Sequence, residues 1–471
     1  MVLWETSKLI EIADIIKGKE GKTLEFKRDL SSFKPVMKTL VAFANTAGGI
    51  LVIGRDDSGT ITGIDDVLQA EESIASAIAD SIMPAMMPDI EIITFESREL
   101  LILRVAHWRG PFYLKTEGPE DGVYVRLGST NRKAGPEILA ELHRTKRRVS
   151  FDQEPCTELN EDEFDMDKAK SVFKSVNRSI DKHKLESLGL VVPYAGRKTV
   201  SNGCIILFGK EIHRNRFFPD ARVSCARFRG TDKSQFIDRL DIEGSILDAV
   251  KDVPKFIRLN TRLFSRIESF KREDIPAYPE VAVREVLVNA LVHSDYSLTG
   301  MRILVSIFSD RMEIQNPGML PFGITLEDFK AGVSKVRNRV ISRIFRELGL
   351  MEEWGSGYKR VVNACSAGGY PEPEWAELGA AIRVVFYPHC ETVENESVDV
   401  PVNVPANVPV NDRQKWFLKQ TGKGIRISGS DLAKYWNISK KTAKRDIADL
   451  KQKGLIEFLG APKNGYYRLR S

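Results

Sequence analysis

Three polar side chains recur at steps of four within residues 279–318. Glu285, Asn289 and His293 fall on one stripe of a 3.6-residue helix. The other side of that helix is apolar and consists of Val286, Leu287, Ala290 and Leu291. A carboxylate, a carboxamide and an imidazole in one row suit a divalent ion carrying phosphates, because the amide oxygen can ligate the ion while the carboxylate orients or deprotonates water. A solvated helix face has the same pattern, so the stripe alone leaves both interpretations open.

Two glycine-containing loops follow this helix. Residues 302–315 alternate as a hairpin that ends at Asn316-Pro317-Gly318, where Gly318 lets the backbone approach a ligand closely. Further on, Gly355-Ser356-Gly357 precedes a helix expected to run through Cys365. A glycine turn at a helix N-terminus can bind an anion, because its free amides and the helix dipole favour phosphate. An ordinary glycine turn has the same sequence.

Basic and aromatic residues are interleaved between residues 109 and 134. The basic ones are Arg109, Lys115, Arg126, Arg132 and Lys133, and the aromatic ones are Phe112, Tyr113 and Tyr124. Such a mixture can hold a phosphate backbone and stack bases, and RNA or single-stranded DNA would be the partner. A half-buried strand over residues 124–129 is the alternative.

Positive charge is concentrated in the C-terminal segment. Residues 412–471 contain 15 Lys and Arg against 5 Asp and Glu, although the net charge of the whole chain is only +5. Helices expected over 412–420, 430–436 and 439–453, followed by a hairpin over 455–469 that turns at 463–465, predict a winged helix. Ser439 is a natural N-cap of the third helix.

The start of that third helix is strongly basic. It carries Lys440, Lys441, Thr442, Lys444 and Arg445. Because recognition helices contact DNA mainly through their first turns, we expect these residues and Ser439 to bind DNA. A protein-binding winged helix is the alternative.

The length of the chain requires several domains. At 471 residues with 42% hydrophobic content, three or four are expected. No apolar run approaches the roughly 20 residues that span a bilayer, and the N-terminus lacks a secretory apolar block, which predicts a cytoplasmic protein with no membrane partner. The five cysteines are scattered, which argues against disulfides and cysteine zinc sites.

Composition shifts suggest where the domains begin and end. We expect a multidomain α/β and α+β protein with an α/β domain over 1–150, a connecting domain over 151–275, a domain over 276–390 whose α/β-sandwich fold is implied by a family resemblance, a Val-Pro-Asn linker over 391–411 and the winged helix over 412–471. Within the connecting domain, residues 204–208 are expected to form a buried strand, and residues 242–270 one or two helices.

Four blocks near the N-terminus carry a family resemblance. They are Glu20…Leu24-Glu25-Phe26-Lys27, then AFANTAGG over 42–49, VIGRDD over 52–57 and YVRLGSTN over 124–131. In this order they resemble the Schlafen Alba-like domain, over roughly residues 10–145. The resemblance implies a nucleic-acid-binding domain. In nuclease members of that family, two glutamates and an aspartate hold a divalent metal.

Carried over to this chain, the resemblance places those carboxylates at Glu20, Glu25 and Asp56. Three carboxylates supply hard oxygens to Mg²⁺ or Mn²⁺, which activates water or stabilises charge at the scissile phosphate. Lys27 shares a strand face with Glu25, so it either adds a catalytic positive charge or forms only a surface ion pair. Nucleic-acid binding without cleavage is the alternative for this domain.

The polar stripe and the two glycine loops together resemble the nucleotide boxes of the GHKL ATPase fold, in a divergent form, over roughly residues 276–389. The resemblance implies that Asn289 ligates Mg²⁺ and that Glu285 orients water. Residues 316–318 would then border adenine and residues 355–357 would hold phosphate, while His293 continues the stripe into the same site.

One position departs from that fold. Asn316 stands where better-known members carry an aspartate that reads the adenine amine, which puts affinity and base preference in question. The connecting region also resembles bacterial proteins labelled RecG-related helicases, but no helicase motor is expected. Gly21-Lys22-Thr23 is not a P-loop, because Ile16 stands where the motif needs glycine and a strand follows instead of a helix.

Together these features predict an ATP-binding protein that acts on nucleic acid. In this hypothesis the Schlafen-like domain is a metal-dependent nuclease, regulated by the GHKL-type ATPase and targeted by the winged helix. The alternative is an ATP-responsive DNA-binding transcription regulator without nuclease activity. A homo-oligomer is expected, because the folds that the chain resembles commonly pair.

Overall fold

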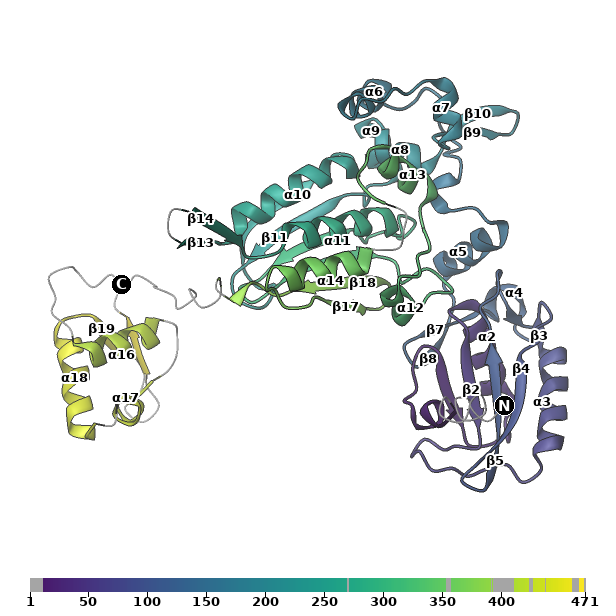
Figure 1. The fold of residues 1–471 in the computed structure, drawn as a ribbon, viewed down its shortest axis with the longest axis horizontal. Coiled ribbons are helices and arrows are strands. Elements are labelled where there is room, and N and C mark those ends of the chain that lie inside the picture. The colour runs from purple at the N-terminus through teal and green to yellow at the C-terminus, as the bar shows by residue number, and fades with distance from the viewer. Residues whose placement is uncertain are drawn as a thin grey trace. The chain divides into compact units, whose positions relative to one another are not determined.

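The computed structural model of the chain divides into two compact units, residues 1–389 and 390–471. The structure describes residues 12–268, 271–352, 357–390, 392, 411–422, 427–436, 438–459 and 466–469. The first unit holds three successive regions and the second holds the C-terminal domain (Figure 1). Among the described residues, no helix combines the length and the apolar character needed to cross a bilayer.

The N-terminal domain is built on a four-stranded sheet in the order β1–β2–β5–β4. β1 and β2 are parallel, and the remaining pairs are antiparallel. Its elements are β1 (Leu24–Lys27), α2 (Phe33–Asn45), β2 (Gly49–Ile53), α3 (Val67–Ser81), β3 (Ile82–Met83), β4 (Asp89–Phe95), β5 (Arg98–Val105), β6 (Tyr113–Leu114), α4 (Gly118–Asp121), β7 (Tyr124–Leu127), β8 (Thr130–Lys133) and α5 (Pro136–Arg147). The helix and strand alternation predicted for this domain is confirmed.

The connecting region adds short helices, a small hairpin and two strands of a larger sheet. Its elements are η1 (Phe151–Gln153), α6 (Met166–Ser175), α7 (Lys182–Ser187), β9 (Val191–Tyr194), β10 (Arg197–Val200), α8 (Asn202–Phe208), α9 (Glu211–Phe217), β11 (Val223–Phe228), β12 (Phe236–Ile242), α10 (Ile246–Asn260), β13 (Leu263–Glu268) and β14 (Lys271–Pro276).

The strand predicted over residues 204–208 is wrong, because these residues lie in α8. Ser201 caps this helix, since its Oγ accepts a hydrogen bond from the Cys204 N–H at 3.2 Å. Every residue of α8 is buried, so no polar face sets a helical period, and a short apolar run of this kind fits a strand equally well. Of the one or two helices predicted over residues 242–270, α10 forms over Ile246–Asn260. Ile242 is instead the last residue of β12, and β13 and β14 follow α10 as an antiparallel hairpin.

The third region completes a six-stranded sheet in the order β12–β11–β15–β16–β18–β17. Its elements are α11 (Glu280–His293), β15 (Ile303–Ile307), β16 (Met312–Pro317), α12 (Leu326–Ala331), α13 (Arg339–Glu347), α14 (Gly357–Ala367), β17 (Glu374–Glu377) and β18 (Ala381–Phe386). Helices α10, α11 and α14 lie side by side over one face of the sheet (Figure 1).

This sheet crosses the domain boundary that was predicted at residue 275. β11 of the connecting region pairs in parallel with β15, from Val223 opposite Ile303 to Arg227 opposite Ile307. One continuous hydrophobic core extends from Cys156 to Phe386. The connecting region and the third region are therefore one folded body.

Within residues 411–469, the described part of the second unit contains three helices followed by a hairpin, the predicted winged-helix arrangement. Its elements are α16 (Asp412–Gly422), α17 (Gly429–Tyr435), α18 (Lys440–Gln452), β19 (Ile456–Leu459) and β20 (Tyr466–Leu469). Buried residues from all three helices and from β19 form its core, among them Phe417, Leu432 and Leu450. The turn predicted at 463–465 and, except for Thr392 and Asn411, the linker predicted over 391–411 lie outside the described residues.

Candidate functional site

A cavity lies between α11 and α14, and we call it the α11–α14 cavity. Its wall includes five of the residues predicted for the nucleotide site, namely Glu285, Asn289, His293, Asn316 and Gly357. Residues after β16 and on β17 and β18 complete the wall. The space inside it, with its open mouth and the adjoining solvent included, is about 1180 Å³.

The first glycine of α14 lies directly against the polar stripe of α11. A Cβ atom on Gly357 would stand 2.9 Å from Glu285 Oε1 and 3.2 Å from Asn289 Nδ2. The Asn289 amide donates a hydrogen bond of 3.4 Å to the same Glu285 oxygen, and Arg360 Nη1 lies 3.3 Å from the other one. The helix N-terminus, the carboxylate and the carboxamide therefore meet at one wall. Gly355 and Ser356 lie outside the described residues.

His293 lines the cavity as a neutral imidazole. Burial, together with the positive charge of Arg337, lowers its pKa from 6.5 to about 4. At neutral pH the ring can therefore accept as well as donate a hydrogen bond. It cannot supply a positive charge to a phosphate.

Residues 316–318, predicted as a loop, are the end of β16 and the residue after it, and only part of this segment lines the cavity. Asn316 is buried in the wall, and its Nδ2 donates 3.1 Å to the neighbouring Pro317 carbonyl. Gly318 is not among the wall residues that the structure describes. Its φ is +98°, and a Cβ atom on this residue would stand 2.8 Å from Asp295 Cβ, so glycine is needed there to pack against Asp295.

The sequence analysis missed an aromatic group in the same wall. Phe329, Tyr358 and Trp375 contact one another, with ring centroids between 5.0 and 6.2 Å apart. Such rings give a flat ligand an apolar surface on which to stack. Tyr358 directly follows the glycine turn, which is the sequence signal that could have identified it. Trp375 comes from a strand 17 residues further on and has no such signal.

The N-terminal carboxylate that was expected to bind a metal ion, Glu25, is instead paired with basic side chains. The Glu25 carboxylate is buried and forms ion pairs with both Lys27 and Arg126. The Arg126 side chain is fully buried and also donates to the Gly21 carbonyl at 3.0 Å and to Asn131 Oδ1 at 2.9 Å. Two side-chain cations therefore occupy the place around Glu25 where a metal ion would be needed.

The other two predicted metal ligands, Glu20 and Asp56, form hydrogen bonds that stabilise the conformation of the nearby backbone. Glu20 Oε1 accepts a hydrogen bond from the Phe26 N–H at 3.0 Å. Asp56 Oδ1 accepts bonds from Ser58 Oγ at 2.6 Å and from the Thr60 N–H at 2.9 Å, and these bonds lower its pKa. The described part of the chain contains no group of three or more His, Cys, Asp or Glu side chains placed to hold a metal ion. The structure therefore does not assemble the predicted three-carboxylate site.

The basic and aromatic block separates into buried and exposed members. Arg126 and Tyr124 are buried, and the Tyr124 hydroxyl donates 2.6 Å to Glu117 Oε2, so neither can contact a nucleic acid. This part of the prediction is wrong, because YVRL is a strand whose side chains are covered. The exposed members are Arg109, Lys115, Arg132 and Lys133.

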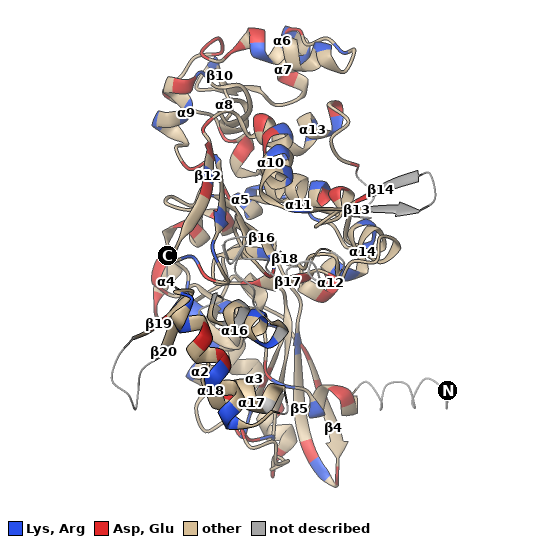
Figure 2. Ribbon diagram, turned by 90° about the vertical axis from the view of Figure 1, so that its left-hand side faces the viewer, with Lys and Arg blue, Asp and Glu red and all other residues tan. Residues whose placement is uncertain are grey.

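Most basic residues of α18, drawn in blue in Figure 2, belong to its exposed N-terminal half, and Lys451 lies in its last turn. Ser439 caps this helix, since its Oγ accepts from the Thr442 N–H at 3.1 Å. The exposed residues of this end are Lys440, Lys441, Lys444 and Arg445. A groove beside them is lined by Lys440, Lys444, Lys451 and Tyr467, which brings the hairpin to the same surface.

Three segments of the chain match known domain families. Residues 20–135 match "Schlafen, AlbA_2", residues 300–386 match "Putative ATP-dependent DNA helicase recG C-terminal", a model of the HATPase_c type, and residues 415–467 match "HTH domain". The chain carries an AlbA_2 domain, an ATPase-like domain and a helix-turn-helix domain. These domains support an ATP-binding, nucleic-acid-related protein, and the helix-turn-helix domain supports DNA binding.

Two solved structures are similar in sequence. The DIP2311 protein from Corynebacterium diphtheriae is 20% identical over 98% of this chain and 96% of its own, with a TM-score of 0.43. The N-terminal domain of a "Putative ATP-dependent DNA Helicase RecG-related Protein" from Nitrosomonas europaea is 28% identical over 26% of this chain and 92% of its own, with a TM-score of 0.21. No match was found among curated proteins.

A substitution at Arg126 tests whether Glu25 is held by an ion pair. Arg126→Met should lower the free energy of unfolding of the AlbA_2 domain by about 3–5 kcal/mol, because it removes the fully buried partner of the Glu25 carboxylate and leaves it only the more exposed Lys27. Urea unfolding of the full chain measures the loss. Arg132→Met, at an exposed arginine on the adjacent β8, should change stability by no more than about 0.5 kcal/mol. Equal effects would contradict the assignment.

Gly357→Ala should weaken nucleotide binding at least about tenfold, or 1.4 kcal/mol. The added methyl group would displace the Glu285 carboxylate from Asn289. Calorimetric titration with Mg-ATP measures the affinity. Gly135→Ala is the matched control, since its Cβ would meet nothing closer than 3.5 Å. Wild-type affinity in the Gly357 variant would show that the ligand does not use this wall.

Stability should decrease as the pH falls from about 6.5 to about 4. The unfolded chain protonates His293 near pH 6.5 and the folded chain only near pH 4, so the unfolded state binds the additional proton across this interval. His293→Gln should remove up to about 3 kcal/mol of that loss. Unfolding curves across this pH range test it, with the exposed His143→Gln as the control that keeps the wild-type pH dependence.

Proposed function

We propose that this protein is an ATP-responsive DNA-binding regulator. In this proposal the α11–α14 cavity binds Mg-ATP, the winged helix binds duplex DNA, and the AlbA_2 domain binds nucleic acid without cutting it. The observation that carries the proposal is the meeting of Glu285, Asn289 and the N-terminus of α14 at one wall of the α11–α14 cavity.

The residues of this wall fit a triphosphate and its Mg²⁺. Asn289 and Glu285 offer the hard oxygen ligands that Mg²⁺ prefers, and the free amides at the start of α14 suit phosphate oxygens. The aromatic group of Phe329, Tyr358 and Trp375 suits a flat base. Bound Mg²⁺ would neutralise part of the triphosphate charge. Arg360, 3.3 Å from Glu285, holds that carboxylate in place beside Asn289.

Hydrogen bonds connect the wall of the α11–α14 cavity directly to the AlbA_2 domain, so a nucleotide bound in the cavity would act on that domain through them. Leu320 lines the cavity, and its N–H donates 2.9 Å to Glu377 Oε1, which also forms an ion pair of 2.8 Å with Lys22 of the AlbA_2 domain. A second link runs from the Gly323 N–H to the Thr46 carbonyl at 2.6 Å. A change in the loop after β16 on ATP binding would therefore be felt by the N-terminal domain.

Metal-dependent cleavage is not part of this proposal. Glu25 is neutralised by Arg126 and Lys27, and Glu20 and Asp56 are used in backbone hydrogen bonds. The nuclease alternative therefore has less support than the regulator.

The decisive experiment combines calorimetry with DNA binding. Asn289→Ala should abolish Mg-ATP binding and with it any effect of ATP on the affinity for a labelled DNA duplex, whereas Asn215→Ala, at an exposed asparagine on α9, should leave both unchanged. ATP binding that survives in the Asn289 variant would refute the site.

A parallel incubation with RNA, single-stranded DNA and duplex DNA plus Mn²⁺ or Mg²⁺ should yield no products. Cleavage that disappears in a Glu25→Gln variant would instead restore the nuclease alternative.

A further inference from the structure

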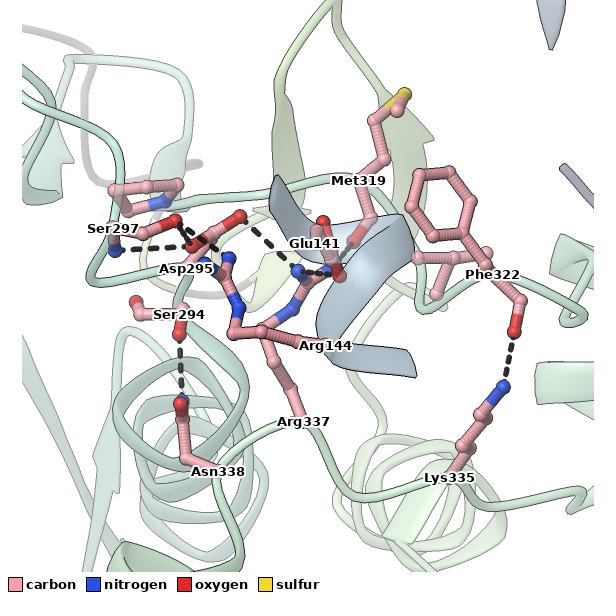
Figure 3. Close-up of polar contacts among 12 residues, drawn as sticks. Glu141, Arg144, Ser294, Asp295, Ser297, Met319, Phe322, Lys335, Arg337 and Asn338 are labelled. Atoms are coloured by element: carbon pink, nitrogen blue, oxygen red, sulfur yellow. Dashed lines mark hydrogen bonds and ion pairs between the residues drawn. The ribbon is translucent and has the colours of Figure 1, made fainter. Parts of the chain in front are cut away.

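A second cavity lies where α5 of the AlbA_2 domain meets the segment that precedes α13, and we call it the junction cavity. It is strongly basic: the cationic residues in its wall are Arg109, Arg144, Arg148, Lys335, Arg337 and Arg339. Only two acidic residues share the wall, Glu141 and Asp295. Figure 3 shows both carboxylates beside the Arg337 guanidinium.

Both acidic side chains are already occupied by one arginine. Arg337 forms ion pairs with Glu141 and, at 3.2 Å, with Asp295, and it also donates to the Met319 carbonyl at 2.6 Å. Its side chain is only 8% exposed, and its Nε has no hydrogen-bond partner among the described residues. Both carboxylates of the wall are therefore paired with Arg337, and Arg144 pairs instead with Glu154 outside the wall, at 3.8 Å.

Four of the remaining cations lack an acidic partner within the described chain. The Lys335 side chain donates only to the Phe322 carbonyl and the Arg339 side chain only to the Arg148 carbonyl, although the Arg339 backbone N–H donates to Asp152. The side chains of Arg109 and Arg148 are exposed and contact no carboxylate of the described chain. The pKa of Lys335 is lowered by burial and then by the positive charge of Arg109. Each of these cations raises the electrostatic cost of the others, so an anion bound among them would relieve repulsion.

The side-chain types indicate which anion this is. Guanidinium groups present several donors in a planar fork that matches phosphate oxygens, and an ammonium group adds a mobile positive charge. Several arginines and a lysine around one concavity exceed what a single carboxylate could balance. A phosphate group carries the higher charge and the additional acceptor oxygens.

We propose that the junction cavity binds a phosphate group, supplied either by a nucleic-acid backbone or by a free polyphosphate. Pro321 and Lys335 line this cavity and the α11–α14 cavity alike. The phosphate site is therefore linked to the nucleotide site through a shared wall. The link, though not the phosphate site itself, rests on the proposed function.

Arginine modification with phenylglyoxal tests the proposal in the full chain, residue by residue. Modification of Arg109, Arg148 and Arg339 is followed by mass spectrometry with no ligand, with a short thymidylate oligomer, and with inorganic pyrophosphate at constant ionic strength. A probe at about ten times its Kd should slow the reaction of these arginines about tenfold by mass action. Arg343, exposed on α13 outside the cavity, should react at its unliganded rate.

Each outcome either identifies the source of the bound phosphate group or refutes the proposed phosphate site. Protection by the oligomer alone identifies a nucleic-acid backbone, protection by pyrophosphate alone identifies a free polyphosphate, and protection by both identifies a general phosphate site. Protection by neither probe overturns the proposal.

A variant provides the second test. Arg148→Glu should abolish the protection of Arg109 and Arg339, whereas Arg343→Glu should leave it unchanged; persistent protection in the Arg148 variant would also overturn the proposal. A non-hydrolysable ATP analogue should alter the protection of Arg339 in the wild type but not in Asn289→Ala. Loss of that response alone, with protection intact, would refute the nucleotide link and leave the phosphate site standing.

Discussion

The first unit depends on one buried guanidinium. Arg337 contacts α5 through Glu141, the loop that follows α11 through Asp295, and the loop after β16 through Met319 (Figure 3). A charge of this kind is costly to remove from water, and it is tolerated only where opposite charges and hydrogen-bond acceptors surround it. The three segments are therefore held together at the point where the AlbA_2 and ATPase-like domains meet.

The residues that follow Arg337 in the sequence add further hydrogen bonds at the same junction. The Asn338 amide donates to the Val292 and Ser294 carbonyls at 2.8 and 2.7 Å, and the Asp152 carboxylate accepts the N–H groups of Arg339 and Ile341. Two cavities border this short segment, one suited to a nucleotide and one to a phosphate. Pro321 and Lys335 line both cavities, so a ligand in either one would contact residues that also border the other, which is the contact that coupling between two sites requires.

Side chains that share one face of a helix could be predicted from the sequence, because their spacing follows the helical period. Ion pairs between residues far apart in the sequence could not. The spacing of Glu285, Asn289 and His293 placed them on one helix face, and the structure lines one cavity with all three. The ion pairing of Glu25 could not be predicted, because its partner Arg126 lies 101 residues away in the sequence. A glutamate that binds a metal ion and one that forms an ion pair also look identical in sequence. The basic junction was missed for the same reason, since its arginines come from separate segments that only tertiary packing brings together.

The pairing of β11 with β15 determines which pieces of this chain can be studied in isolation. A fragment that starts at residue 276 would leave β15 as an unpaired edge and remove α10 from the hydrophobic core. An open apolar edge of that kind recruits other strands, so such a fragment would aggregate. The smallest self-contained version of the ATPase-like domain must therefore begin before Val223, and it carries the connecting region with it.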